Sequence, residues 1–103
     1  MNAQMHPALD QALAVSRELL VAAAQADVPA IGRLDADRFR LLKSLRPLRD
    51  RFSAGDWMIL KEISELNDRA MGLMEHHRRA MERSLDMAAV GRRAVAAYFD
   101  TGP

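Results

Sequence analysis

The sequence predicts an all-α protein, an elongated antiparallel helical bundle in which two shorter helices pack along one long C-terminal helix. Half of the 103 residues are hydrophobic, but only 5% are aromatic. The apolar content consists mainly of Ala, Leu and Met, which are good helix formers. Four prolines and five glycines leave long tracts unbroken. The length fits a single domain over residues 1–103.

The first helix is expected over about residues 7–26. Pro7 suits an opening turn, where the missing N–H donor has no cost. Apolar and small residues then recur at steps of four and three, which is the spacing of one helix face. They are Leu9, Leu13, Ser16, Leu20 and Ala23.

A second helix follows over about residues 28–46. Asp27 is placed to cap its N-terminus, and Pro29 fits its first turn. Pro47 is expected to end it. The predicted packing face carries Ile31, Leu34, Arg38, Leu41, Leu45 and Leu48.

The third helix is expected over about residues 53–99 and would be roughly 65 Å long. Ser53 and Asp56 have the spacing of a capping box, with Asp replacing the usual Glu or Gln. One apolar seam runs along its whole length, at alternating steps of four and three. Its members are Ile59, Ile63, Leu66, Ala70, Leu73, His77, Ala80, Ser84, Met87, Gly91, Ala94 and Tyr98. A second row at intervals of seven widens the apolar face. It comprises Leu60, Asn67, Met74, Met81, Ala88 and Val95.

Two packings fit this pattern. The first helix could fold back beside the second in a three-helix bundle and leave half of the third helix protruding. Alternatively, the first two helices could lie end to end along the third. Residues 1–32 carry a net charge of −2, residues 33–52 of +4, residues 53–75 of −3 and residues 76–99 of +3. Opposite charges would meet in the end-to-end packing, so charge and length favour it.

Catalytic and ligand motifs are nearly absent. There are no cysteines, and the glycines are too dispersed for a phosphate-binding loop. His76 and His77 point about 100° apart around a helix, so they cannot share a metal ion. Basic residues near position 78 alternate with acids and lack interleaved aromatics, which argues against nucleic-acid binding. No segment is apolar enough to insert into a membrane. We expect a cytoplasmic, non-enzymatic protein without cofactor.

Arg38 and the methionines are the more informative residues. Arg38 occupies a packing position, where it could contact a partner; pairing with an acid such as Glu62 or Glu65 is the favoured interpretation. Methionine suits adaptable binding surfaces as well as cores. Five of the seven lie in the third helix, namely Met58, Met71, Met74, Met81 and Met87.

These features resemble the FliT-type flagellar export chaperones over most of the chain. Leu19 to Leu45 (LLVAAAQADVPAIGRLDADRFRLLKSL) looks like the family's apolar helix, short acidic break and second helix containing an arginine. Ile63 to Tyr98 (ISELNDRAMGLMEHHRRAMERSLDMAAVGRRAVAAY) looks like its long helix, with a glycine, a basic pair and a tyrosine near the end. In the break the family often has Gly-Asp-Trp, whereas this chain has Ala26, Asp27 and Val28.

The resemblance implies a chaperone that binds the C-terminal helical region of the filament cap protein, prevents its premature self-association and delivers it to export apparatus components. Some relatives also bind a transcriptional regulator or have a further C-terminal helix that restrains binding; neither is indicated here. A cargo helix would lie in a groove beside the third helix. The expected cargo-binding residues are Arg38, Leu66, Leu73, Met74, Met81, Leu85, Met87 and Tyr98.

Two other functions are kept as alternatives. The chain could be a structural or regulatory helical hairpin whose partner is itself, as a homodimer. Less favoured is a small all-helical enzyme like the chorismate mutases, because the longest helix is last and no convergent Arg, Lys and Gln set is evident.

Overall fold

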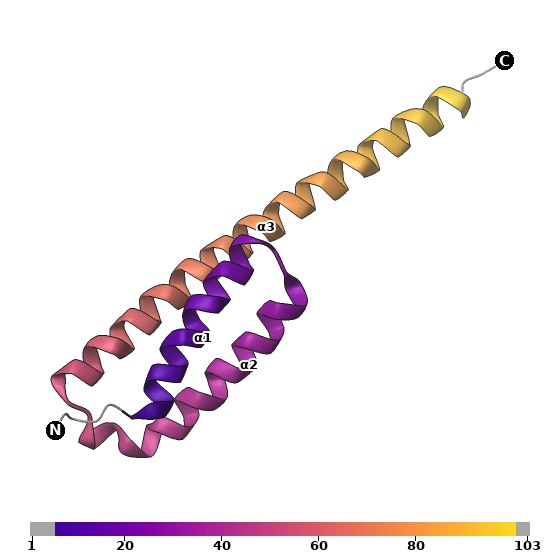
Figure 1. Ribbon diagram of the computed structural model, residues 1–103. Coiled ribbons are helices and arrows are strands. Elements are labelled where there is room, and N and C mark those ends of the chain that lie inside the picture. Colours follow the sequence, from indigo (N-terminus) through magenta and orange to yellow (C-terminus); the bar gives the residue numbers. More distant parts are fainter. Residues whose placement is uncertain (1–5, 101–103) are drawn as a thin grey trace.

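The protein is an antiparallel three-helix bundle from which the last helix extends far beyond the other two (Figure 1). The computed structural model describes residues 6–100, with side chains for residues 6–97. The elements are α1 (Pro7–Ala24), α2 (Val28–Leu45), a short 3-10 helix η1 (Arg46–Arg51) and α3 (Ala54–Asp100). The molecule measures 85 × 20 × 19 Å. The predicted all-α, elongated architecture is therefore confirmed.

Helix α1 lies between α2 and α3 and packs against both (Figure 1). It can do so because small side chains on two sides let both neighbours approach closely. Ser16 is only 1% exposed, but its hydroxyl donates to the Ala12 carbonyl at 2.7 Å, so no polar group is left unpaired. The buried residues of α1 are Leu9, Ala12, Ser16, Leu19, Ala22 and Ala23.

A tight reversal joins α1 to α2. The Asp27 N–H donates to the Ala22 carbonyl at 3.0 Å, and the Ala26 N–H donates to the Ala23 carbonyl at 3.1 Å. These two bonds form a Schellman motif, which places Ala26 at the left-handed position with φ of 53°. Asp27 then caps α2 as predicted, because its Oδ1 accepts from the Ala30 N–H at 3.3 Å.

This reversal shows that the end-to-end packing favoured by charge is wrong. Helix α1 folds back beside α2, and only about half of α3 is covered. Surface charges contribute little compared with burial of the apolar faces. Arg17 of α1 pairs with Glu62 of α3 at 2.9 Å, so α1 lies along the acidic half of α3 rather than along its basic half.

Helix α3 begins at the predicted capping box. The Ser53 N–H donates to Asp56 Oδ2 at 2.9 Å, and the Asp56 N–H donates to Ser53 Oγ at 3.1 Å. Before it, Pro47 does not simply end the second helix but lies in the first turn of η1. Phe52 packs edge-on against Trp57, with ring centroids 5.3 Å apart. These contacts close the end of the bundle opposite the α1–α2 turn.

Two buried clusters hold the bundle together. One lies near the α1–α2 turn and contains Leu19, Ala22, Ala23, Leu34 and Ala70. The other lies near the opposite end and contains Leu9, Ala12, Leu45 and Ile63. The seam predicted along α3 is thus buried in its first half.

The remainder of α3 forms an uncovered arm, residues 82–97. All of its side chains except that of Ala89 are exposed, including Leu85 and Met87 at 62% and 74%. A Cβ atom added at Gly91 would meet nothing within 4 Å, so this glycine does not permit a close contact inside the bundle. The predicted seam continues geometrically along the arm without a neighbour among residues 6–100.

Candidate partner-binding groove

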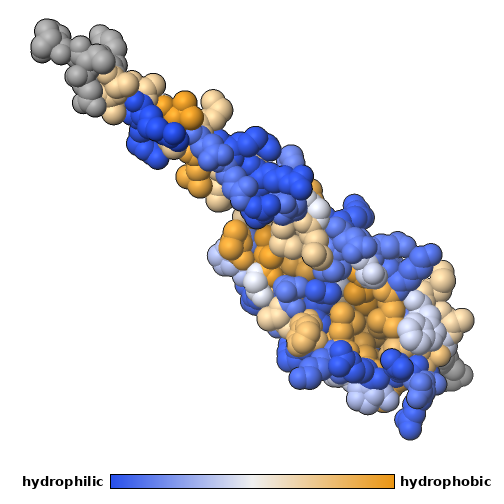
Figure 2. Space-filling view, turned by 180° about the vertical axis from the view of Figure 1, so that it is seen from behind, coloured by the Kyte–Doolittle hydropathy of each residue, from blue (hydrophilic) through white to orange (hydrophobic). Residues whose placement is uncertain are grey.

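The two outer helices α2 and α3 both pack on α1 but do not pack directly on each other. No Cα atom of α2 comes within 8 Å of a Cα atom of α3, which is wider than two helices in contact. Two separate cavities lie between these helices, and we call the surface that joins them the groove. Viewed from behind, the bundle shows an apolar area bordered by hydrophilic residues (Figure 2).

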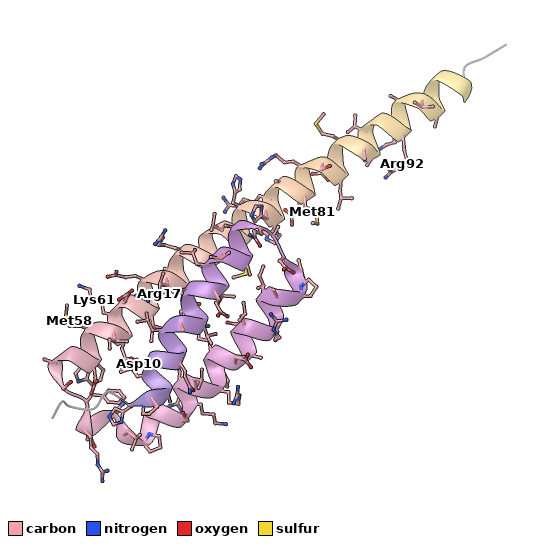
Figure 3. The ribbon with its side chains drawn as sticks, in the orientation of Figure 1. Asp10, Arg17, Met58, Lys61, Met81 and Arg92 are labelled. Carbon is pink, nitrogen blue, oxygen red and sulfur yellow. The ribbon has the colours of Figure 1, made fainter. Side chains whose placement is uncertain are left out.

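One end of the groove is an apolar cavity of about 320 Å³ next to the α1–α2 turn. Ile31 and Met74 also pack against the buried cluster around Leu19, so the cavity walls are anchored to the core. Met81 is 63% exposed and lies beside the turn, toward α2 (Figure 3). The lining residues are Ala26, Val28, Ile31, Met74, His77, Arg78 and Met81.

A second cavity of about 330 Å³ lies at the other end of the groove. Its base is the cluster containing Leu45, and Trp57, 52% exposed, lines it from α3. The lining residues are Leu42, Leu45, Arg46, Arg49, Phe52, Trp57 and Leu60.

Residues that line the groove recur at multiples of seven along both α2 and α3. Ile31 and Met74 belong to the first cavity. Leu45 and Leu60 belong to the second. On α2, Arg38 is seven residues from both Ile31 and Leu45. On α3, Asn67 is seven residues from both Met74 and Leu60. Because α2 and α3 run antiparallel, Arg38 and Asn67 lie at the same level between the two cavities. Each cavity therefore contains an apolar pair from the two helices, whereas the level between the cavities carries Arg38 and Asn67.

The contacts of Arg38 differ from those predicted. Its guanidinium donates to Asp35 Oδ1 at 2.7 Å, one turn away on the same helix, and not to Glu62 or Glu65. Glu62 is paired with Arg17 instead. The Arg38 side chain is only 17% exposed, and its buried Nε–H has no acceptor among the described residues. Arg38 thus lies on α2 with one enclosed donor unused.

Arg78 at the rim of the first cavity is held in place by two carboxylates. Its Nε donates to Glu75 Oε2 at 2.9 Å, and its Nη1 contacts Glu82. The hydrogen bond from Arg78 lowers the pKa of Glu75 to about 2. Beside it, His77 is half-buried, and its buried Nε2 has no partner within the described part of the chain.

The residues expected to bind cargo lie in different parts of the structure. Leu66 is 8% exposed and lies in the bundle interior, so we leave it out of the site. Leu73 and Met74 are half-buried against the core, and Met74 and Met81 line the first cavity. Arg38 lies on α2 between the two cavities and lines neither. Leu85 lies one turn beyond Met81 on the arm, whereas Met87 is about 120° around the helix from Met81. Tyr98 is part of α3, but its side chain lies outside the described residues.

Several groove residues were not among those expected, chiefly Val28 and Ile31 of α2 and Trp57 and Leu60 of α3. The row at intervals of seven, from Leu60 through Met74 to Met81, was the signal that could have identified Leu60; no comparable signal indicated Val28, Ile31 or Trp57. The row was interpreted only as a widening of the packed face, although it forms one wall of the groove.

The fold and groove define a class, a three-helix bundle with an open interhelical groove and a protruding helix. No protein-family model, no curated protein and no solved structure matches the chain. Within residues 6–100, no helix is long and apolar enough to cross a membrane, and no three His, Asp or Glu side chains are grouped to hold a metal ion.

Proposed function

We propose that this protein is a cytoplasmic chaperone of flagellar type III export, which binds the C-terminal helical region of the filament cap protein. In this role it keeps that region from self-associating before export and presents it to the export apparatus. The proposal assigns a binding role without catalysis. The observation that carries it is the groove between α2 and α3, and the resemblance of Leu19–Leu45 and Ile63–Tyr98 to FliT-type chaperones names the cargo.

The groove lies where a fourth helix would pack against α2 and α3. Three antiparallel helices with one gap are completed by a helix lying between α2 and α3, as in a four-helix bundle. The two cavities provide apolar pockets for side chains on one face of that helix. A partner helix would then cover Met74 and Met81 at one end and Trp57 and Leu60 at the other.

The arm extends the same surface beyond the bundle. Leu85 and Val95 are 62% and 56% exposed. Leu85 and Val95 follow Met81 by four and fourteen residues, so both lie near the same side of α3 as Met81. A cargo helix that leaves the groove beside Met81 would continue along this stripe. The arm therefore lengthens the contact surface for an extended helical segment.

The direct test is copurification of the tagged protein with the C-terminal segment of the cognate filament cap protein. The matched control is the same segment without its final helical stretch. We expect a stable complex with the first segment and none with the second. The proposed cargo is wrong if neither segment is retained over a range of salt concentrations.

Self-association is the second candidate function, and the uncovered arm favours it. Exposed Met87 and Val90 give the arm a further apolar side that the groove does not continue. Light scattering across a concentration series tests it. A concentration-dependent dimer without affinity for the cap segment supports this alternative, whereas a monomer that binds the segment contradicts it.

A further inference from the structure

The level between the two cavities is polar, whereas each cavity contains an apolar pair from the two helices. Arg38 and Asn67 occupy the level between the two cavities, seven residues from the apolar pairs on either side. Among the described residues, Asn67 donates to the sulfur of Met71, a weak acceptor, at 3.5 Å and to no other group. A polar level inside an otherwise apolar seam is the arrangement that fixes the register of packed helices.

Arg38 is positioned to donate hydrogen bonds at the level between the two cavities. Asp35 holds one end of its guanidinium at 2.7 Å, and the aliphatic part of the side chain is largely covered. The buried Nε–H has no acceptor among residues 6–97. A buried donor without an acceptor is costly, and a carboxylate can accept two hydrogen bonds from one guanidinium.

The second cavity of the groove carries positive charge. Arg46 and Arg49 line the second cavity and form no ion pair among the described residues. Arg78 lines the first cavity, but Glu75 and Glu82 pair with it, so the unpaired positive charge lies at the second cavity. Neither cavity is lined by a carboxylate. A negatively charged helix would therefore be attracted to this surface, and a positively charged one would be repelled.

This charge distribution decides against a second copy of the chain as the occupant. The apolar part that one copy could insert into the groove of another is its protruding helix. Residues 76–97 carry five arginines against Glu82 and Asp86. Basic residues would then meet basic residues, which disfavours that complex.

We propose that the groove selects an acidic amphipathic helix, which places a carboxylate against Arg38 and Asn67 and apolar side chains about two turns to either side. This inference rests on the proposal that the groove binds a partner helix, and it specifies the chemistry of that helix. The carboxylate would contact the part of the Arg38 guanidinium that remains exposed beside Asp35, because the Nε–H itself is closed to solvent. It also sets the register, because a shift by one turn would place an apolar residue against Arg38.

The test uses three synthetic amphipathic peptides of about 25 residues, long enough to reach along both cavities. The apolar face of each peptide carries leucines. The peptides differ only at one central position on that face, which is Glu, Gln or Lys. Binding to the intact protein is measured by fluorescence anisotropy at two salt concentrations. We expect the Glu peptide to bind about tenfold more tightly than the Gln peptide, and the Lys peptide to bind most weakly.

The chain contains a matched control for Arg38. Arg40 also pairs with an aspartate three residues earlier, Asp37, at 3.2 Å, but its side chain is 73% exposed. We expect Arg38→Met to remove the preference for the Glu peptide and Arg40→Met to retain it. The peptide comparison on the unmodified protein stands even if Arg38→Met does not fold.

The outcomes separate this inference from the proposed function. Equal binding of all three peptides, weakened by Met81→Glu, overturns the carboxylate selectivity and leaves helix binding in place. If Arg38→Met still prefers the Glu peptide, the role of Arg38 is also overturned, because another group then binds the carboxylate. Failure of every peptide to bind overturns both, whereas failure of the cap segment alone overturns only the proposed cargo.

Discussion

Ile31 of α2 and Met74 of α3 line the same cavity from opposite sides, and both pack against the buried cluster around Leu19. The wall of the groove is therefore continuous with the core of the bundle. A helix bound there would be positioned by residues that the fold already holds in place. Preorganisation of this kind reduces the entropy lost on binding.

The α1–α2 turn should become more stable when its alanine is replaced by glycine. Ala26 has a φ of 53°, a left-handed conformation that costs a non-glycine residue about 1 kcal/mol. We expect Ala26→Gly to raise the free energy of unfolding by up to about 1 kcal/mol in urea titrations. In contrast, Ala36→Gly, at an exposed position within α2, should lower it by about 1 kcal/mol.

The capping box of α3 should contribute measurably to stability. Ser53 Oγ accepts from the Asp56 N–H, and replacing it with alanine leaves that donor without its partner. We expect Ser53→Ala to cost about 1 kcal/mol. Ser44→Ala is the control, since the Ser44 hydroxyl donates to the Leu41 carbonyl within an exposed helix surface. Equal stability of the two variants would show that the cap contributes nothing.

The bundle core should be sensitive to a cavity at its centre. Leu19 is 1% exposed and belongs to the cluster beneath the groove. Leu19→Ala should lower the free energy of unfolding by about 3 kcal/mol and broaden the groove floor. Thermal unfolding followed by circular dichroism measures this loss. A change below about 1 kcal/mol would mean that the cluster does not support the fold.

Hydrogen exchange should divide α3 into two parts. Residues 59–77 pack in the bundle, whereas the arm has no neighbour in the described structure, and an isolated helix of this length is marginal in water. We expect slow exchange in the first part and fast exchange over residues 84–97. Adding the cap segment should slow exchange in the arm. Uniformly slow exchange in the free protein that disappears on dilution would indicate a second copy covering the arm.

Local patterns were sufficient to predict the helices. Period and capping residues placed all three helices, including the box at Ser53 and the cap at Asp27. No local pattern indicated the return of α1, because it depends on a Schellman turn in which alanine adopts a conformation typical of glycine. Surface charge suggested the opposite packing and was outweighed by burial of residues such as Leu19 and Leu34.

The groove was harder to predict than the helices. Met74 and Met81 were identified from their types and positions, but the opposite wall at Val28 and Ile31 depends on how α2 lies relative to α3. The partner of Arg38 was also mistaken, since two acids on α3 seemed suitable and Asp35 on the same helix is the one in contact. Such contacts follow from tertiary arrangement, which spacing along one helix does not specify.

The central claim is that the groove between α2 and α3 binds the helix of a partner. Met74→Glu with Met81→Glu should abolish binding and leave the protein helical, but Met74 also packs against the core, so this double variant is expected to lose some stability. Met81→Glu alone is the cleaner change because the side chain is 63% exposed. Its matched control is Met58→Glu, 68% exposed on a different part of α3 (Figure 3).

The decisive measurement is calorimetric titration of the cap protein's C-terminal segment into the unmodified protein, Met81→Glu and Met58→Glu. If the groove is the binding site, we expect Met81→Glu to weaken binding by at least about tenfold, or 1.4 kcal/mol. Met58→Glu should bind like the unmodified protein. Unchanged affinity in Met81→Glu would contradict the assignment of the groove as the binding site.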